Sequence, residues 1–319
     1  MMQRRKFIQT STAAGILTLS GSSMYCGGEK MHNVRMPKRK LGRTGEKLSQ
    51  LGFGGILVMD VEQDRANDMV AHAFDHGINY YDVAPSYGNA EMQLGPALEP
   101  YRKQSFLACK TGKRDKKGAQ EELHASLKNM RTDYFDLYQL HHITSEEDVE
   151  RAFAPDGAME TFIRAKQDGK VRYLGFSAHS EKAALMAMQR YDFDTILFPI
   201  NFVCWYEGNF GTRVLAEAKK TNKGILALKG LAYRRLHDEE ERPYEKCWYM
   251  PIPEDEDRMA EIAFRFTYEQ GVTAAIPPGS PVFWDRAFHI ASNLKPLTEK
   301  ELDELKQWAK GQTPLFKRA

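Results

Sequence analysis

Four polar residues follow three apolar segments of this 319-residue chain, and their types suit acid–base chemistry on a carbonyl group. Asp82 and Tyr87 lie at the end of segment 78–84 and in the turn after it, Lys110 ends segment 106–111, and His141 ends segment 134–141. A phenol with a pKa of about 10 donates protons poorly at neutral pH unless a cation lowers that pKa. We expect Lys110 to be this cation and Asp82 to keep it charged. His141 is expected to orient the carbonyl and assist the proton transfer.

Taken singly, each of the four also has a structural explanation. Asp82 could cap the following helix and Tyr87 could pack in the core. Lys110 could be a charge at the rim, and His141 could be a hydrogen-bonded core histidine. The catalytic interpretation therefore depends on a fold that brings all four side chains to one place.

Apolar stretches of strand length alternate with segments of helical periodicity along the chain. Helical periodicity is seen over 66–77, 158–169 and 257–270, and in a segment that begins after an expected break at Gly118. Strands that are apolar nearly throughout need cover on both faces, so the pattern predicts an α/β fold, a (β/α)8 TIM barrel. An open doubly wound sheet is the alternative. The eight predicted strands are 48–55, 78–84, 106–111, 134–141, 171–178, 195–201, 224–230 and 273–279.

Three further segments are expected to cover the barrel. Residues 36–45 predict an N-terminal hairpin, and Thr298 with Glu301 predicts a capping box that starts a C-terminal capping helix. Residues 232–257 follow the seventh strand and are long, charged and aromatic. Loops at this end of a barrel form the binding site, so we expect this segment to lie over its mouth.

The first 30 residues read as a twin-arginine signal peptide and linker, followed by one barrel domain over 36–319. Arg4 and Arg5 precede Lys6-Phe7-Ile8 and a mildly apolar stretch over 10–23. That stretch is too short for a permanent membrane span, so it predicts a removable export signal and a periplasmic or extracytoplasmic protein. A lipid anchor at Cys26 is disfavoured, because Tyr25 occupies the place of the small residue that such processing prefers.

Charge and cysteine spacing exclude several other classes. The 45 basic residues nearly balance the 43 acidic residues, which favours no nucleic-acid partner. Cys26, Cys109, Cys204 and Cys247 lack the close spacing of metal ligands, so we expect neither a metal nor an iron–sulfur cluster. A disulfide between Cys204 and Cys247 is left open, and unpaired thiols are the favoured alternative.

The order and spacing of several motifs resemble the aldo-keto reductase family over residues 36 to about 310. In that family, the residues that correspond to Asp82, Tyr87, Lys110 and His141 are the catalytic tetrad. The tyrosine protonates the carbonyl oxygen as hydride arrives from NADPH. The motifs are Lys40-Leu-Gly-Arg-Thr-Gly45, Gly52-Phe-Gly-Gly55, Asn79-Tyr-Tyr-Asp-Val-Ala-Pro-Ser-Tyr-Gly88, Cys109-Lys-Thr111, Asp133-Tyr-Phe-Asp-Leu-Tyr-Gln-Leu-His141, Gly169-Lys-Val-Arg172, Gly175-Phe-Ser177 and Ala275-Ile-Pro277.

The resemblance also implies a nicotinamide cofactor, with NADP(H) expected over NAD(H). Three departures leave that choice and the affinity open. Ala178 replaces an asparagine, Leu197 replaces a glutamine, and the stretch that ends at His289 lacks the family's Lys-Ser and Glu-Asn pairs. The implied cofactor-binding residues are Gly54, Asp82, Ser177, Leu197, Leu228, Lys229, Leu231, Ser280 and Arg286.

Two classes of function remain after this comparison. The first is an NAD(P)-dependent oxidoreductase that acts as a monomer on a small carbonyl or sugar-like substrate, with His142, Tyr233 and Trp248 in the substrate pocket. Export would favour a tightly held cofactor, and redox-neutral sugar chemistry is one use of such a cofactor. The second is an exported ligand-binding protein, with a carbohydrate as one candidate ligand, on a reductase scaffold.

Overall fold

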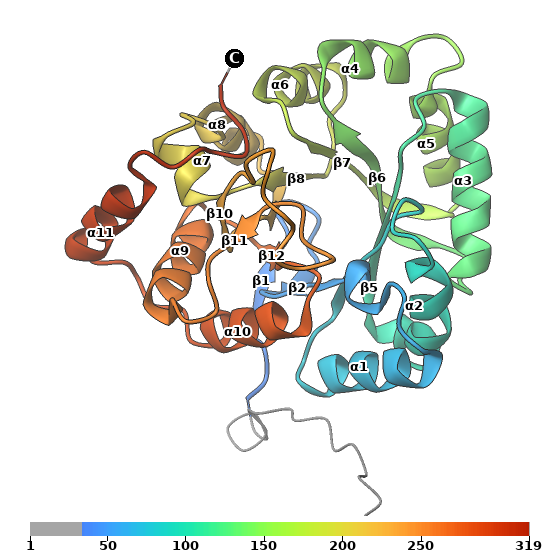
Figure 1. Cartoon of the computed structure of the whole chain (residues 1–319). Helices are drawn as coiled ribbons and strands as arrows, with labels where there is room; N and C mark the ends of the chain where they lie inside the picture. Colours follow the sequence, from blue (N-terminus) through green and yellow to red (C-terminus); the bar gives the residue numbers. More distant parts are fainter. Residues whose placement is uncertain (1–33, 319) are drawn as a thin grey trace, which may run out of the picture. The chain divides into compact units, whose positions relative to one another are not determined.

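Eight parallel strands form a barrel in the computed structural model, which describes residues 34–318. The expected signal segment 1–30 therefore lies outside the described residues. Neighbouring strands follow the order of the chain, and a parallel bridge between Leu51 and Ala275 joins the first strand region to the last. This arrangement confirms the (β/α)8 prediction over the open sheet (Figure 1). The barrel strands are β3 (Phe53–Gly54), β4 (Tyr80–Asp82), β5 (Phe106–Thr111), β6 (Phe135–Ile143), β7 (Val171–Ala178), β8 (Thr195–Pro199), β9 (Gly224–Leu228) and β12 (Ala274–Ile276).

Helices alternate with these strands and cover the outside of the barrel (Figure 1). The expected break at Gly118 is wrong, because Asp115 caps the helix there by accepting the Gly118 N–H at 2.8 Å. The helices are α1 (Gln63–Asp75), α2 (Ala90–Leu98), α3 (Lys116–Asn129), α4 (Glu146–Phe153), α5 (Ala158–Gln167), α6 (Glu181–Arg190), α7 (Phe202–Tyr206), α8 (Thr212–Lys220), α9 (Asp257–Glu269), α10 (Pro281–Ser292) and α11 (Glu299–Ala309), with the 3-10 helices η1 (Gly55–Val58) and η2 (Glu99–Gln104).

The N-terminal hairpin consists of β1 (Lys38–Lys40) and β2 (Lys47–Ser49), which pair antiparallel. The prediction of one strand over 48–55 is therefore wrong, since Lys47–Ser49 belong to the hairpin and the barrel is joined only from the Leu51 bridge and Phe53–Gly54. The physical reason is that Leu48 belongs to the hairpin yet is fully buried, so its apolar character does not mark a barrel strand.

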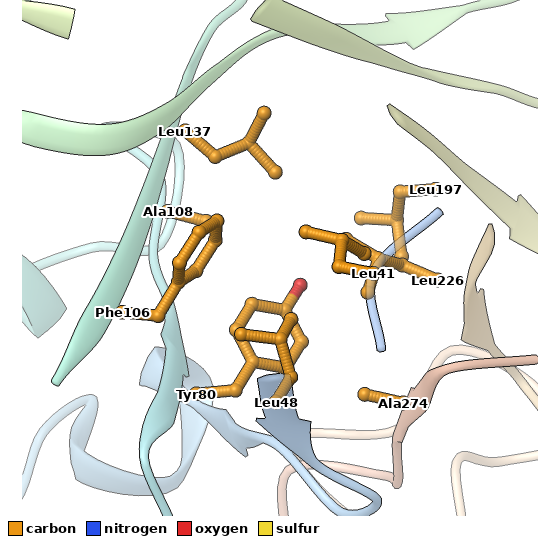
Figure 2. Close-up of a cluster of buried hydrophobic side chains, with 9 residues drawn as sticks. All are labelled: Leu41, Leu48, Tyr80, Phe106, Ala108, Leu137, Leu197, Leu226 and Ala274. Carbon is orange, nitrogen blue, oxygen red and sulfur yellow. The ribbon is translucent and has the colours of Figure 1, made fainter. Parts of the chain in front are cut away.

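Side chains from the hairpin and the strands fill the barrel interior (Figure 2). Leu41 and Leu48 enter from the hairpin, and Leu228 and Ile276 pack against the cluster from the carboxyl ends of their strands. The barrel therefore has a closed apolar core, and its carboxyl end holds the polar residues. The nine buried members are Leu41, Leu48, Tyr80, Phe106, Ala108, Leu137, Leu197, Leu226 and Ala274.

The C-terminal helix begins with the predicted capping box. Thr298 accepts the Glu301 N–H, and the Glu301 side chain accepts the Thr298 N–H. This helix, α11, packs against α7 and α9. Beyond it the chain returns to the barrel, where the Arg318 N–H donates to the Gly208 carbonyl at 2.9 Å. Within residues 34–318, no helix is long and apolar enough to cross a membrane.

The segment after β9 forms a second antiparallel pair, β10 (Ala232–Arg234) and β11 (Met250–Pro251). The loop between them reaches across to the region after β3, where the Lys246 ammonium donates to the Met59 carbonyl. Because β3 and β9 both end at the mouth, this bond places the loop over the carboxyl end of the barrel, as predicted.

Candidate active site

Lys110 is the centre of the polar cluster at the mouth. It lies on β5 with a fully buried side chain, and its ammonium forms an ion pair with Asp82 on β4. The same ammonium lies 3.4 Å from the Tyr87 hydroxyl and donates to the Val83 carbonyl at 3.2 Å. Burial opposes the charge on Lys110, but Asp82 and Tyr87 together raise the pKa of the amine above its ordinary value. The amine is therefore held as a cation, as expected.

Asp82 has two further donors that the sequence analysis did not identify. Tyr80 donates to Asp82 Oδ2 at 3.2 Å, and the Gln139 amide donates to the same oxygen at 3.3 Å. Each lies two residues before a tetrad member on the same strand, so strand alternation places it on the same inward face. The two-residue spacing in the sequence could therefore have identified Tyr80 and Gln139 as partners of Asp82.

Tyr87 is half-buried in the turn after β4, and its ring meets the His141 ring edge to face at 5.7 Å. The expectation of a lowered phenol pKa is not met in this structure. Burial raises the pKa of Tyr87, and this effect outweighs the opposing influence of Lys110. The phenol therefore stays protonated in the resting protein, and the nearby Lys110 cation can favour its ionisation only as the proton leaves.

His141 ends the inward face of β6 and is held on both sides. The Ser86 hydroxyl lies 3.4 Å from His141 Nδ1, and the Arg114 guanidinium donates to the His141 carbonyl at 2.8 Å. Burial and the nearby Lys110 cation lower the pKa of His141 to about 2. The imidazole is therefore neutral at physiological pH and can donate a hydrogen bond to a carbonyl oxygen.

Replacing His141 with glutamine should flatten the acid side of the stability profile. Below pH 6.5 the unfolded chain protonates His141, whereas the folded protein resists protonation down to about pH 2. The free energy of unfolding is therefore lost as the pH falls, at up to about 1.4 kcal/mol per pH unit for one such group. Urea denaturation at pH 6.5 and pH 4.5 measures this loss. Equal losses in the wild type and the variant would contradict the assignment.

The side chains expected around the nicotinamide lie at the ends of β3, β7 and β9. Ser177 is 2% exposed, and its hydroxyl oxygen accepts the His142 N–H at 2.8 Å. Its own hydrogen has no acceptor within residues 34–318, so it can donate to a ligand amide. A Cβ added at Gly54 would lie 3.0 Å from the Ile276 side chain, so a larger residue there would require Ile276 to shift. These features fit a flat amide-bearing ring, with Leu228 half-buried beside it.

The residues expected at the adenosine end are less available. The Ser280 hydroxyl lies at the start of α10 and makes no capping bond. Arg286 donates instead to the Pro253 carbonyl at 2.8 Å and to Asp257 at 2.8 Å, which fastens the segment after β11. Leu231 is buried and its carbonyl accepts the Ile252 N–H, while Leu197 lies in the barrel core.

The three expected pocket residues are spread over the mouth. His142 is exposed, adopts a positive φ of 60°, and lies 4.6 Å from the His179 ring. Tyr233 is half-buried and stacks on Phe202 at 6.2 Å. Trp248 lies in the loop between β10 and β11 and is 52% exposed. His179 was not identified from the sequence.

A parallel eight-stranded barrel with a Tyr–Lys–Asp–His set at its carboxyl end defines a class of oxidoreductases. The model of the aldo/keto reductase family matches residues 50–310 of the chain. The chain belongs to this family, and it is an oxidoreductase. Its described residues contain no group of three or more His, Cys, Asp or Glu side chains that could hold a metal, and Cys109, Cys204 and Cys247 are free and buried.

Relatives of known sequence and structure agree with this assignment. An uncharacterized oxidoreductase, YqkF, of Bacillus subtilis is 34% identical over 45% of this chain, and the match spans 49% of that protein. L-galactose dehydrogenase of Arabidopsis thaliana is 30% identical over 69% of this chain and 72% of its own length. The holo form of aldo-keto reductase AKR11C1 from Bacillus halodurans shares the fold, with a TM-score of 0.68, 23% identity, and coverage of 89% of this chain and 100% of that one.

Proposed function

We propose that this protein transfers hydride between a nicotinamide cofactor and the carbonyl or alcohol group of a small polar substrate, with Tyr87 as general acid and base. The observation that carries the proposal is the buried Lys110–Asp82 pair beside the Tyr87 hydroxyl. A buried charge pair is costly to maintain, and such pairs cluster at functional sites. A protein that only binds ligands gains nothing from this pair, which favours an enzyme over a binding scaffold.

The chain's own residues perform the proton chemistry. Tyr87 donates its hydroxyl proton to the carbonyl oxygen, and Lys110 at 3.4 Å stabilises the phenolate that remains. Asp82 keeps Lys110 charged, and neutral His141 donates to the same substrate oxygen. In the reverse direction the phenolate takes the alcohol proton. When bound, the nicotinamide cofactor supplies or accepts the hydride that completes the change between carbonyl and alcohol.

The cofactor would be held by Ser177, Gly54 and Leu228 at the nicotinamide end and by Ser280 near the start of α10. We propose NADP(H) as the preferred form, on the family resemblance. Because Arg286 is bonded to Pro253 and Asp257, it must exchange these partners before it can contact a 2′-phosphate. Equilibrium titration with NADP+ and NAD+ tests the preference, and tighter binding of NAD+ would overturn it.

A sugar-like substrate and export are the finer parts of the proposal. The curated relative that acts on L-galactose supports the first, as do the exposed Trp248 and the histidines at the mouth. Arg4 and Arg5 ahead of the apolar stretch support export by the twin-arginine route to a periplasmic or extracytoplasmic location, where the protein would act as a monomer. An exported enzyme meets little free nucleotide, so a retained cofactor follows from the two proposals together.

One experiment tests hydride chemistry and export. The full chain is expressed in a bacterium with the twin-arginine route, and the extracytoplasmic fraction is purified without added cofactor. Denaturation of the purified protein should then release NADP(H) or NAD(H) in near-stoichiometric amount, and mass spectrometry identifies the released nucleotide. A double variant, Arg4→Lys with Arg5→Lys, should stay in the cytoplasm and serves as the control for export. Protein that carries no nucleotide and binds none when it is added would overturn the oxidoreductase mechanism.

A further inference from the structure

Lys229 differs from the buried cations of the structure in having no carboxylate partner. Within residues 34–318, each lysine or arginine less than 9% exposed pairs with an acid, as Lys110 does with Asp82. The other three such pairs are Arg102 with Asp136, Lys223 with Asp192, and Arg265 with Glu301. Lys229 is half-buried and forms neither a hydrogen bond nor an ion pair through its ammonium in this part of the chain. Its one defined contact is the ring of Tyr249, whose centroid lies 5.2 Å away.

Lys229 lies at the mouth of the barrel. Burial lowers the pKa of its amine to about 8, so the amine is still mostly protonated at neutral pH. Lys229 directly follows β9, and its φ of 66° is the left-handed conformation that side chains other than glycine adopt only under constraint. The Asn201 amide donates to the Lys229 carbonyl at 3.3 Å, which fastens this strained turn. Strain of this kind is common at ligand-binding positions.

Two histidines share this region with Lys229. The rings of His142 and His179 lie 4.6 Å apart, at the ends of β6 and β7. Lys229 follows the carboxyl end of β9, so all three side chains belong to the mouth at which the parallel strands of the barrel end.

Burial is the first cause of the low pKa of both imidazoles, and the Lys229 charge adds to it in both, after Arg114 in the case of His142. Phe316 from the C-terminal tail stacks on His179 at 4.8 Å and holds that ring in place. Both neutral imidazoles can donate an N–H, so the cluster offers one amine and two further donors. The Arg114 guanidinium, which donates to the His142 carbonyl at 3.3 Å, adds a second cation on the β6 side, and Asp148, which accepts from Arg114 at 3.2 Å, is the acid beside it.

We infer that Lys229, with His142 and His179, binds an anionic group, a carboxylate or a phosphate, carried by the substrate. This inference rests on the proposed function and names its substrate class: a carbonyl or alcohol compound that bears a negative charge. The cofactor's own phosphates are the other source of such a group. The substrate is favoured because both histidines come from the strands that end beside His141, where the reacting carbonyl must lie.

Two aldehydes of the same shape test the inference on the cofactor-loaded protein. 4-Formylbenzoate and 4-formylbenzamide carry the same reacting group and differ in the charge at the far end. The wild type should reduce the carboxylate with a kcat/KM at least about tenfold higher, the effect of one charged hydrogen bond. Lys229→Met should lower the ratio of kcat/KM for the carboxylate to kcat/KM for the amide by about 10- to 100-fold, a comparison that any effect on cofactor binding leaves unchanged. Lys229→Arg should recover part of the loss.

A matched control removes a lysine that is not in the cluster. Lys113 lies just beyond β5 at the same end of the barrel with a side chain 54% exposed, so Lys113→Met should leave both rates unchanged. Equal rates for the two aldehydes in the wild type would overturn the inference. It would also be overturned if Lys229→Met weakened nucleotide binding and left the ratio of the two rates unchanged, which would assign the cation to the cofactor.

Failure of the proposed function gives a different result, because neither aldehyde would then react. Calorimetric titration with 4-(hydroxymethyl)benzoate and 4-(hydroxymethyl)benzamide still decides the inference in that case. Binding of the carboxylate alone, lost in Lys229→Met, supports the anion site without turnover. Equal binding of both compounds, or of neither, rejects it.

Discussion

Tyr87→Phe is expected to abolish nearly all turnover and to leave nucleotide binding intact. The variant keeps the ring that faces His141 at 5.7 Å and loses only the hydroxyl beside Lys110. A positioned general acid contributes about 10²- to 10⁴-fold to a rate, so kcat should fall by that factor. Single-turnover kinetics with cofactor-loaded protein measure the loss, and a fluorescence titration measures nucleotide affinity.

The control for this variant is Tyr138→Phe on β6. Tyr138 is fully buried and its hydroxyl accepts or donates no hydrogen bond within residues 34–318, so the substitution removes a phenol oxygen from the core and leaves the site unchanged. This control should keep full activity. A Tyr87→Phe enzyme that retained a third or more of the wild-type kcat would exclude Tyr87 as the proton donor.

Asp82→Asn is expected to produce the largest loss of stability among single changes at the site. The substitution leaves the Lys110 ammonium fully buried without its counter-charge. Removing one partner of a buried ion pair costs about 3 to 5 kcal/mol of folding free energy. Guanidinium denaturation at pH 7 should show this loss, and kcat should fall with it because Lys110 no longer stays reliably charged.

A double variant separates the structural role of the pair from its chemical role. Lys110→Met combined with Asp82→Leu removes both charges, so it should be more stable than Asp82→Asn alone. The double variant should still be inactive, because Tyr87 then has no cation beside its hydroxyl. Equal stability of the single and double variants would show that the uncompensated Lys110 charge is not the cause of the loss.

Local patterns in the sequence were sufficient for the fold class and for the expectation that Asp82, Tyr87, Lys110 and His141 lie together at one end of the barrel. Eight apolar stretches between helical segments need helices on both faces of a parallel sheet, which favoured a barrel over an open doubly wound sheet, and the structure has the barrel. Asp82, Lys110 and His141 were identifiable because each sits near the carboxyl end of a predicted strand, and all such ends meet at one mouth. The capping box of Thr298 and Glu301 is local as well, and it was predicted correctly.

Long-range packing decided what the patterns could not. Leu48 read as part of a barrel strand, yet it belongs to the hairpin that fills the barrel interior, because burial alone does not distinguish the two. The pKa of Tyr87 was also decided by packing. The positive charge of Lys110 was enough to predict that Lys110 lowers this pKa, but burial raises it by more, and the burial depends on how the turn after β4 packs.

The bonding partners of the charged side chains were also decided only by the tertiary structure. Arg286 was expected to contact phosphate, and it instead bonds to the carbonyl of Pro253, 33 residues away in the chain. Lys229 looked like one cofactor contact among several, and only the folded chain shows that it has no acidic partner within residues 34–318 and follows a strand that ends at the same mouth as the strands that position His142 and His179. A sequence determines which charges and strands exist, because these are local properties. Which charges are paired, buried or left free depends on contacts between distant segments, and these exist only once the barrel has closed.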